Sequence, residues 1–257
     1  IKKMKLINFL LAFLLPLFAI AQNTEGEVTY TETVKLQLDF GDGPEAEEMR
    51  KMVPPTQSFP KTLYFNANES LYQDKEGTEE EGNVEVSGSS GGGDFQMKIQ
   101  RPDNKIYRNM AEGSTIEYRE FFGRNFLITD KAKSPAWKIT GEQKKLLGYV
   151  CQKATVQLDS MTNLTAWFAP QIPVSTGPSV NAGLPGLILE MAMNGDQRTI
   201  VATQVEFKKL PKDALVKPSK GKEMTAEEFK KIEAEKMKEM NMETGGAPGT
   251  MRMIIRN

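Results

Sequence analysis

The sequence predicts a mainly β protein: an antiparallel meander that forms a curved open sheet or a partial barrel, followed by a C-terminal amphipathic helix. Short segments in which apolar and polar residues alternate recur along most of the chain, and this period of two is that of a half-buried strand. Turn residues separate these segments, and no helix long enough to join parallel strands lies between them. The clearest helical repeat comes after residue 224.

The composition excludes several classes of site. The chain has 257 residues, no histidine, one cysteine and a formal net charge of -1. Without histidine there is no Ser-His-Asp triad, no Cys-His pair and no HExxH zinc site. A single cysteine excludes an intramolecular disulfide and a CxxC motif, and a near-neutral chain is a poor match for nucleic acid. We therefore expect no catalytic, cofactor-binding or metal-binding residues and no nucleic-acid partner, and a binding protein rather than an enzyme.

Residues 1–21 have the features of a secretory signal peptide. Three lysines precede an apolar run at residues 6–18, and a small-x-small pattern ends at the predicted cleavage site between Ala21 and Gln22. A membrane anchor is the alternative, but the run is shorter than the roughly 20 residues that a spanning helix needs. Removal of three lysines and no acid would shift the net charge from -1 to -4. We expect an exported protein, in the periplasm or associated with the cell surface or outer membrane, without a transmembrane helix in the mature chain.

The predicted sheet domain covers residues 22–223. Its first strand, at residues 28–40, has apolar side chains on one face and polar side chains on the other. The further candidate strands, in order, lie at residues 62–66, 70–73, 95–99, 116–118, 126–129, 137–140, 149–158, 164–168, 187–192 and 199–207.

Two segments interrupt this pattern. Residues 41–60 form an acidic, proline-containing connection that includes a short predicted helix at 45–52. Residues 74–94 are rich in Glu, Ser and Gly and supply few apolar side chains for a core, so we expect a mobile loop there.

The last segment, residues 224–257, is predicted to be a helix followed by a loose tail. Thr225 and Glu228 have the spacing of a capping box at the start of a helix over residues 226–241. One face of this helix carries an apolar stripe: Phe229, Ile232, Met237 and Met240. We interpret the stripe as packing on the sheet, with partner binding as the alternative.

A glycine- and proline-containing motif precedes the strand at 187–192. It consists of Gly183, Leu184, Pro185, Gly186, Leu187 and Ile188. It follows Gly-Tyr-Val-Cys-Gln-Lys-Ala at 148–154, Ala-Trp-Phe at 166–168, Ile-Pro at 172–173 and Gly-Pro at 177–178. Together these segments resemble the GLPGLI family, exported proteins found mainly in Bacteroidota that have no established activity. The sequence departs from the family at residues 179–182, where members often have aromatic residues, so a site lined by those aromatics would be altered.

The motif itself predicts a rigid turn that leads into a strand. Gly183 and Gly186 allow positive φ or close backbone approach, and Pro185 fixes φ. Gly, Pro and Leu carry no catalytic group, so a structural role is favoured over ligand contact.

Five residues are candidates for contact with a ligand or partner: Trp167, Phe168, Tyr118, Leu187 and Glu190. Trp167 and Phe168 should point to opposite faces of a strand, so that one belongs to the core. The aromatic and leucine residues would line an apolar cavity if the protein binds an apolar ligand. Glu190 is interpreted as an ordinary outward-facing strand residue, with an acid at a pocket rim as the alternative.

The single cysteine and one short tripeptide also carry predictions. Cys151 alternates with neighbours on a predicted strand, and without a histidine to lower its pKa we expect a buried, inert thiol. Asp159-Ser160-Met161 resembles the short O-glycosylation signal of Bacteroidota and lies between two predicted strands.

Three functions remain open on these observations. The first is an exported, non-catalytic envelope protein whose partner is an apolar small molecule or an envelope protein. The second is an accessory module of an outer-membrane receptor or adhesion system. The third is a hydrolase that uses carboxylates, which requires two buried acids facing each other in a concave pocket.

Overall fold

The computed structural model describes residues 24–36, 38–39, 43–78, 84–90, 93–99, 103–131, 134–243 and 252–253. The predicted leader at 1–21 lies outside these residues. No described helix combines the length and the apolarity needed to cross a membrane.

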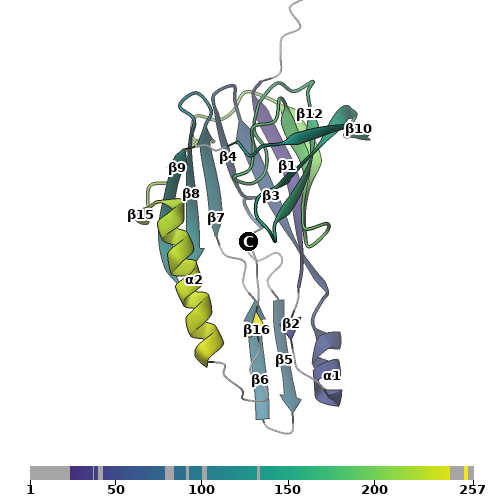
Figure 1. The fold of residues 1–257 in the computed structure, drawn as a ribbon, viewed down its shortest axis with the longest axis vertical. Helices are drawn as coiled ribbons and strands as arrows, with labels where there is room; N and C mark the ends of the chain where they lie inside the picture. The colour runs from purple at the N-terminus through teal and green to yellow at the C-terminus, as the bar shows by residue number, and fades with distance from the viewer. Residues whose placement is uncertain are drawn as a thin grey trace, which may run out of the picture.

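Twelve strands form one large sheet (Figure 1). In spatial order they are β10 (Lys138–Leu146), β11 (Tyr149–Gln157), β12 (Asn163–Ala169), β13 (Leu187–Met193), β14 (Arg198–Phe207), β1 (Gly26–Lys35), β3 (Thr56–Phe65), β4 (Glu69–Asp74), β7 (Asn104–Asn109), β8 (Ser114–Phe121), β9 (Arg124–Lys131) and β15 (Lys222–Met224). All neighbours are antiparallel except β15, which runs parallel to β9. The sheet is open, with β10 and β15 as its edges. The predicted fold class is therefore confirmed.

The remaining elements lie outside this sheet. They are β2 (Leu38–Asp39), which pairs with β16 (Arg252–Met253), the helix α1 (Pro44–Met52), the hairpin of β5 (Val84–Ser90) and β6 (Gly93–Ile99), and the helix α2 (Ala226–Glu243). Figure 1 shows α1, β2, β16 and the β5–β6 hairpin below the large sheet.

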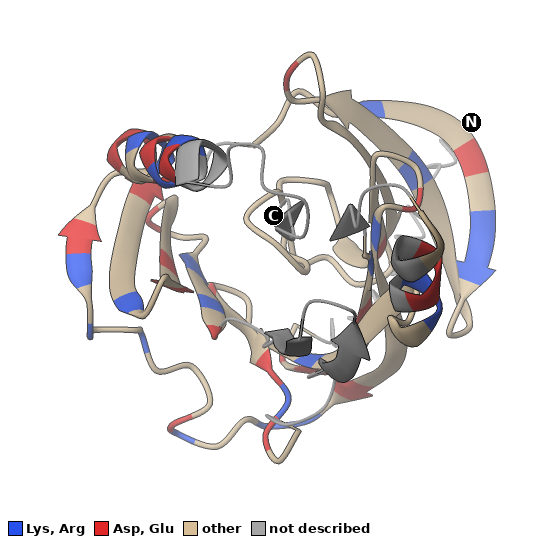
Figure 2. Ribbon diagram, turned by 90° about the horizontal axis from the view of Figure 1, so that it is seen from below, with Lys and Arg blue, Asp and Glu red and all other residues tan. Residues whose placement is uncertain are grey.

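Seen from below, the strands form a curved wall (Figure 2). We call the face that carries Tyr30 and Phe65 the inner face. Both of these side chains are fully buried in the largest apolar cluster of the described chain. The connection between β12 and β13, residues 170–186, covers this part of the inner face. The connection is hydrogen-bonded to β13 as well as packed on the sheet, because the Leu187 N–H donates to the Ile172 carbonyl and the Ile188 N–H to the Thr176 carbonyl, both at 3.0 Å. Within the sheet, the Tyr30 hydroxyl donates to the Ile188 carbonyl at 2.7 Å.

α2 covers the inner face at the other side of the sheet. Phe229 is buried against Phe126 and Ile128 of β9, with Ile232 packed at the edge of the cluster. The helix starts with the predicted capping box: the Thr225 N–H donates to Glu228 at 2.7 Å, and the Glu228 N–H donates to the Thr225 hydroxyl at 3.2 Å. The apolar stripe thus packs on the sheet at Phe229 and Ile232, whereas the side chains of Met237 and Met240 lie outside the described residues.

The segment predicted as a loop at 74–94 differs from the structure. β4 continues to Asp74, and β5 occupies 84–90, where it pairs with β6 as a hairpin. Val84 is opposite Ile99 and Val86 is opposite Met97. The alternation of apolar residues predicts β6, but its partner β5 contains only two valines among polar residues. Pairing with β6 satisfies the backbone of β5, which its composition does not reveal.

Candidate functional site

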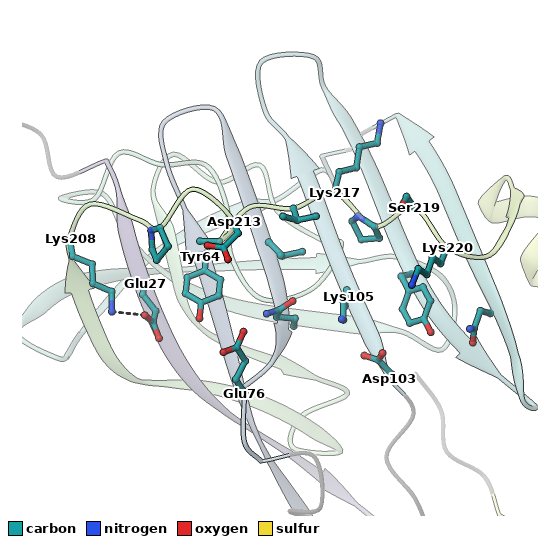
Figure 3. A pocket seen from close by; sticks show the side chains of 18 of the residues that line it. Glu27, Tyr64, Glu76, Asp103, Lys105, Lys208, Asp213, Lys217, Ser219 and Lys220 are labelled. Carbon is teal, nitrogen blue, oxygen red and sulfur yellow. Dashed lines mark ion pairs between the residues drawn. The ribbon is translucent and has the colours of Figure 1, made fainter.

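A long connection crosses the outer face of the sheet. Residues 208–221, here called the strap, leave β14 and pass over β1, β3, β4, β7, β8 and β9 before they join β15 at the edge (Figure 3). This route separates the strap from the inner-face covers, because it lies against the side chains that point the other way from Tyr30.

The strap is held at three points. Near its start, the Leu210 N–H donates to a Glu25 carboxylate oxygen at 2.7 Å. In the middle, Leu215 packs on a buried outer-face cluster of Leu71, Tyr107, Ile116 and Leu127. At its end, Gly221 has φ +146, and a Cβ at this position would lie 3.1 Å from the Asn125 carbonyl oxygen. A glycine is therefore required where the strap meets β9.

Between the strap and the sheet lies a groove of about 900 Å³. The sheet side contributes Glu27, Tyr64, Leu71, Gln73, Lys105, Tyr118 and Asn125, the flanking connections contribute Glu76 and Asp103, and the strap contributes Lys208, Lys209, Pro211, Asp213, Ala214, Val216, Lys217, Pro218, Ser219 and Lys220. A volume of this size holds a ligand of several rings.

Two tyrosines form the aromatic part of the groove floor. Tyr64 on β3 and Tyr118 on β8 are half-buried outer-face residues. Burial raises the pKa of Tyr64, and the charges of Glu27 and Glu76 raise it further, while Lys208 acts in the opposite direction. Burial also raises the pKa of Tyr118, with Asp103 and Glu120 adding to the effect. Both hydroxyls therefore remain protonated around neutral pH and can donate or accept hydrogen bonds.

An ion-pair network closes the groove at the β14 end. Lys208 Nζ lies 2.6 Å from a Glu27 carboxylate oxygen and 3.0 Å from one of Glu206. The hydrogen bonds to these two acids raise the pKa of Lys208. In Figure 3, Tyr64 and Glu76 extend from the sheet side below the strap, next to the Lys208–Glu27 pair. This end of the groove therefore presents fixed carboxylate acceptors beside an aromatic ring.

Within the described residues, no two buried acids face each other in the groove. Among the described residues, the buried acids are Glu32 and Glu117. Glu32 is paired with Arg198 at 2.8 Å and Glu117 with Arg119 at 2.5 Å, and neither acid lines the groove. The described part of the chain also holds no cluster of three or more potential metal ligands from His, Cys, Asp and Glu.

The structure brings some of the candidate contact residues together, since Trp167 and Glu190 are opposite each other on β12 and β13, but it separates them from Tyr118. Tyr118 lies in the groove, whereas Phe168 and Leu187 are fully buried in two different core clusters. Trp167 is half-buried with Lys144 Nζ 4.4 Å and Lys153 Nζ 5.9 Å from its ring centroid. Lys144 also pairs with Glu190 at 2.6 Å. Of the five candidates, Tyr118 lines the groove, and Trp167, Phe168, Leu187 and Glu190 do not.

The motif at 183–188 forms a turn against the core. A Cβ on Gly183, which has φ +98, would lie 2.0 Å from Ser134 Oγ, and one on Gly186 would lie 2.4 Å from the Ala169 carbonyl oxygen. Leu184, Leu187 and Ile188 are buried, while Pro185 is exposed. The motif thus anchors the connection at 170–186 on the inner face.

Cys151 is fully buried, and burial raises the pKa of its thiol to about 11. It remains a neutral thiol at neutral pH, which favours the inert role. Asp159, Ser160 and Met161 are exposed in the turn between β11 and β12.

Sequence reasoning missed most of the groove. Its signal was present in the strap, where five of fourteen residues are lysine and only one is acidic. The floor could not be found this way, because Glu27, Tyr64 and Tyr118 are far apart in the chain and meet only when β1, β3 and β8 are placed in one sheet.

The model of a family described as "N-glycanase peptide, N-terminal domain" matches residues 94–231, more than half of the chain. The chain belongs to this family. The matched region includes β7 to β14, the strap and the first turns of α2. The resemblance to the GLPGLI family is therefore wrong. The hexapeptide specifies a turn that packs on a sheet, and such a turn does not distinguish one β-sheet family from another.

Two solved structures share this fold. PNGF-II in space group P21 aligns with a TM-score of 0.52 at 18% identity over 81% of this chain and 33% of that chain. PNGF-II in space group C2 aligns with a TM-score of 0.50 at 18% identity over 81% of this chain and 32% of that chain. The chain thus spans about a third of the length of these structures. Among curated proteins, none matches this chain.

Proposed function

We propose that this chain is a glycan-binding domain and that the groove under the strap holds the sugar residues. The observation that carries the proposal is the groove floor, where the rings of Tyr64 and Tyr118 lie among carboxylate and amide side chains. The family supports it, because its description refers to the N-terminal domain of an N-glycanase.

The chemistry of the floor suits sugars better than the apolar ligand expected from the sequence. An aromatic ring packs against the C–H face of a sugar ring, and its hydroxyl can bond to the sugar edge. Carboxylate and amide oxygens accept hydrogen bonds from sugar hydroxyls, and Gln73 and Asn125 also donate. Charged and amide groups of this kind would be left unpaired beside an apolar ligand, which costs binding energy.

The domain would act as a recognition module. It spans about a third of PNGF-II, and its described part lacks a pair of buried acids facing each other in the groove. We include the predicted export in the proposal, since residues 1–21 have the features of a leader. A protein partner of the envelope is a weaker alternative, because the groove is concave and polar.

The test is calorimetric titration of the purified chain with neutral N-glycans, followed by variants of the floor. Tyr64→Ala and Tyr118→Ala should each weaken glycan binding about tenfold or more, corresponding to about 1.4 kcal/mol. Tyr118→Phe keeps the ring and should retain most of the affinity.

Trp167→Ala is the matched control, because Trp167 is a half-buried aromatic outside the groove. Its glycan affinity should equal that of the unmodified chain. Loss of binding in Trp167→Ala with none in the tyrosine variants would overturn the proposed site. No binding of any glycan by the folded chain, verified by circular dichroism, would overturn the function.

A further inference from the structure

The lysines of the strap are a second feature of the groove. Lys208 is held by Glu27 and Glu206. Lys209, Lys212, Lys217 and Lys220 are exposed, and no ion pair joins any of them to another residue within the described parts of the chain. Asp213 is the strap's single acid. Because the whole chain has a net charge of only -1, this concentration of positive charge is local.

The opposite wall of the groove carries three acids and one lysine, Lys105. Glu27, Glu76 and Asp103 line the sheet side and its flanking connections, whereas Lys209, Lys217 and Lys220 line the strap side. Figure 3 shows Glu27, Glu76 and Asp103 below the strap, with Lys105 on the same side, and Lys217 and Lys220 along the strap. Acids therefore outnumber lysines on the sheet side, which also carries the two tyrosines, whereas lysines outnumber acids on the strap.

This distribution constrains the ligand. A uniformly anionic polymer such as nucleic acid would be repelled by the carboxylates of the floor. A wholly neutral ligand would leave the lysines of the rim unused. The complementary ligand is neutral where it meets the tyrosines and anionic where it meets the strap.

We propose that the groove selects acidic oligosaccharides, with neutral sugar rings on the floor and a carboxylate or sulfate group at the lysines of the strap. This inference rests on the proposed glycan binding and adds the class of glycan. Lysine ammonium groups form charge-assisted hydrogen bonds with such anions. Because the lysines are exposed, each contributes modestly and the effect requires several of them.

The test compares one biantennary N-glycan with and without terminal sialic acid. The sialylated form should bind about tenfold more tightly at about 50 mM NaCl, and the difference should shrink at about 500 mM because salt screens exposed charges. Triple substitution Lys209→Gln, Lys217→Gln and Lys220→Gln should reduce the affinity for the sialylated form to that for the neutral form and leave the latter unchanged.

A charge-matched control removes three exposed lysines elsewhere: Lys131→Gln, Lys138→Gln and Lys145→Gln. These lie at the ends of β9 and β10, do not line the groove and have no ion pair within the described residues. The control should keep the preference for the sialylated glycan. All six substituted positions are exposed, so the thermal midpoint of both variants should match that of the unmodified chain.

The outcomes separate the two proposals. If neither glycan binds, the glycan-binding function fails. If both bind equally and the strap variant changes nothing, glycan binding stands and the acidic selectivity is overturned. Binding of duplex DNA or of phosphatidylglycerol vesicles as tight as that of the sialylated glycan would also overturn the selectivity, because it would show general affinity for polyanions.

Discussion

The two faces of the large sheet are covered by different segments, and only the outer face has an accessible groove beneath its cover. On the inner face, the connection at 170–186 brings buried apolar residues, including Ile172, Val174 and Leu184, and hydrogen-bonds to the strands beneath it. On the outer face, the strap brings Leu215 as its anchor on the apolar cluster, together with five lysines. The same strands therefore bury their inner side chains and leave a polar groove over their outer ones.

This difference shows that the covering segment determines whether a face of the sheet is enclosed as core or stays accessible as a groove. The inner face also contains charges, but they are enclosed with their partners: Glu32 accepts from the Tyr72 hydroxyl at 3.1 Å and pairs with Arg198. On the outer face, the acids Glu76 and Asp103 of the groove remain accessible. Polar groups that are buried must be paired within the protein, whereas accessible ones remain free to bind a ligand.

The largest expected effect is a contrast between aromatic residues of the two faces. Phe168→Ala should lower the free energy of unfolding by about 3–5 kcal/mol, because the ring is fully buried and leaves a cavity. Tyr118→Ala should cost about 1 kcal/mol, since its ring is already partly in solvent. Urea denaturation of both variants gives the comparison. Equal losses would show that the groove floor is as much a part of the core as the inner face.

A smaller effect is expected where the strap joins β15. Gly221→Ala should lower stability by about 1–2 kcal/mol, because φ +146 is strained for alanine and the new Cβ would meet the Asn125 carbonyl. Because this distortion lies at the strap, the loss of glycan-binding free energy should exceed the loss of free energy of unfolding. Gly195→Ala is the control, since Gly195 has φ +76 and nothing within 4 Å of a Cβ in a turn remote from the strap. A normal affinity in Gly221→Ala would show that the position of the strap does not control the groove.

The smallest effect concerns the pH dependence contributed by the buried Cys151 thiol. The pKa of Cys151 is raised from its ordinary 9.0 to about 11, so the unfolded state ionises first as the pH rises. Its contribution to stability is complete below pH 9 and is lost between about pH 9 and 11. Cys151→Ala should flatten the pH profile of the unfolding midpoint in this range. Rapid labelling of the folded protein by a thiol reagent at pH 8 would contradict the buried, neutral thiol.

The sequence by itself indicated the architecture, because strands and helices have local signatures. Alternation located most strands, and Thr225 with Glu228 marked the start of α2 at the correct residue. It placed Gly183 and Gly186 in a turn, and the positive φ of both residues agrees with that prediction. The family did not follow from this motif and the short segments before it, because each of them constrains only a local conformation whereas a family is defined over a domain.

The tertiary structure alone decided the site. The groove joins residues as distant in sequence as Glu27, Tyr118 and Lys220, and no periodicity relates them. Which of the polar strand residues become a binding surface depends on where the strap crosses, and that route follows from Leu215 on the outer cluster and Gly221 against β9. Local propensity determined the strands of this protein, whereas non-local packing of one lysine-rich connection determined which of their faces carries the groove.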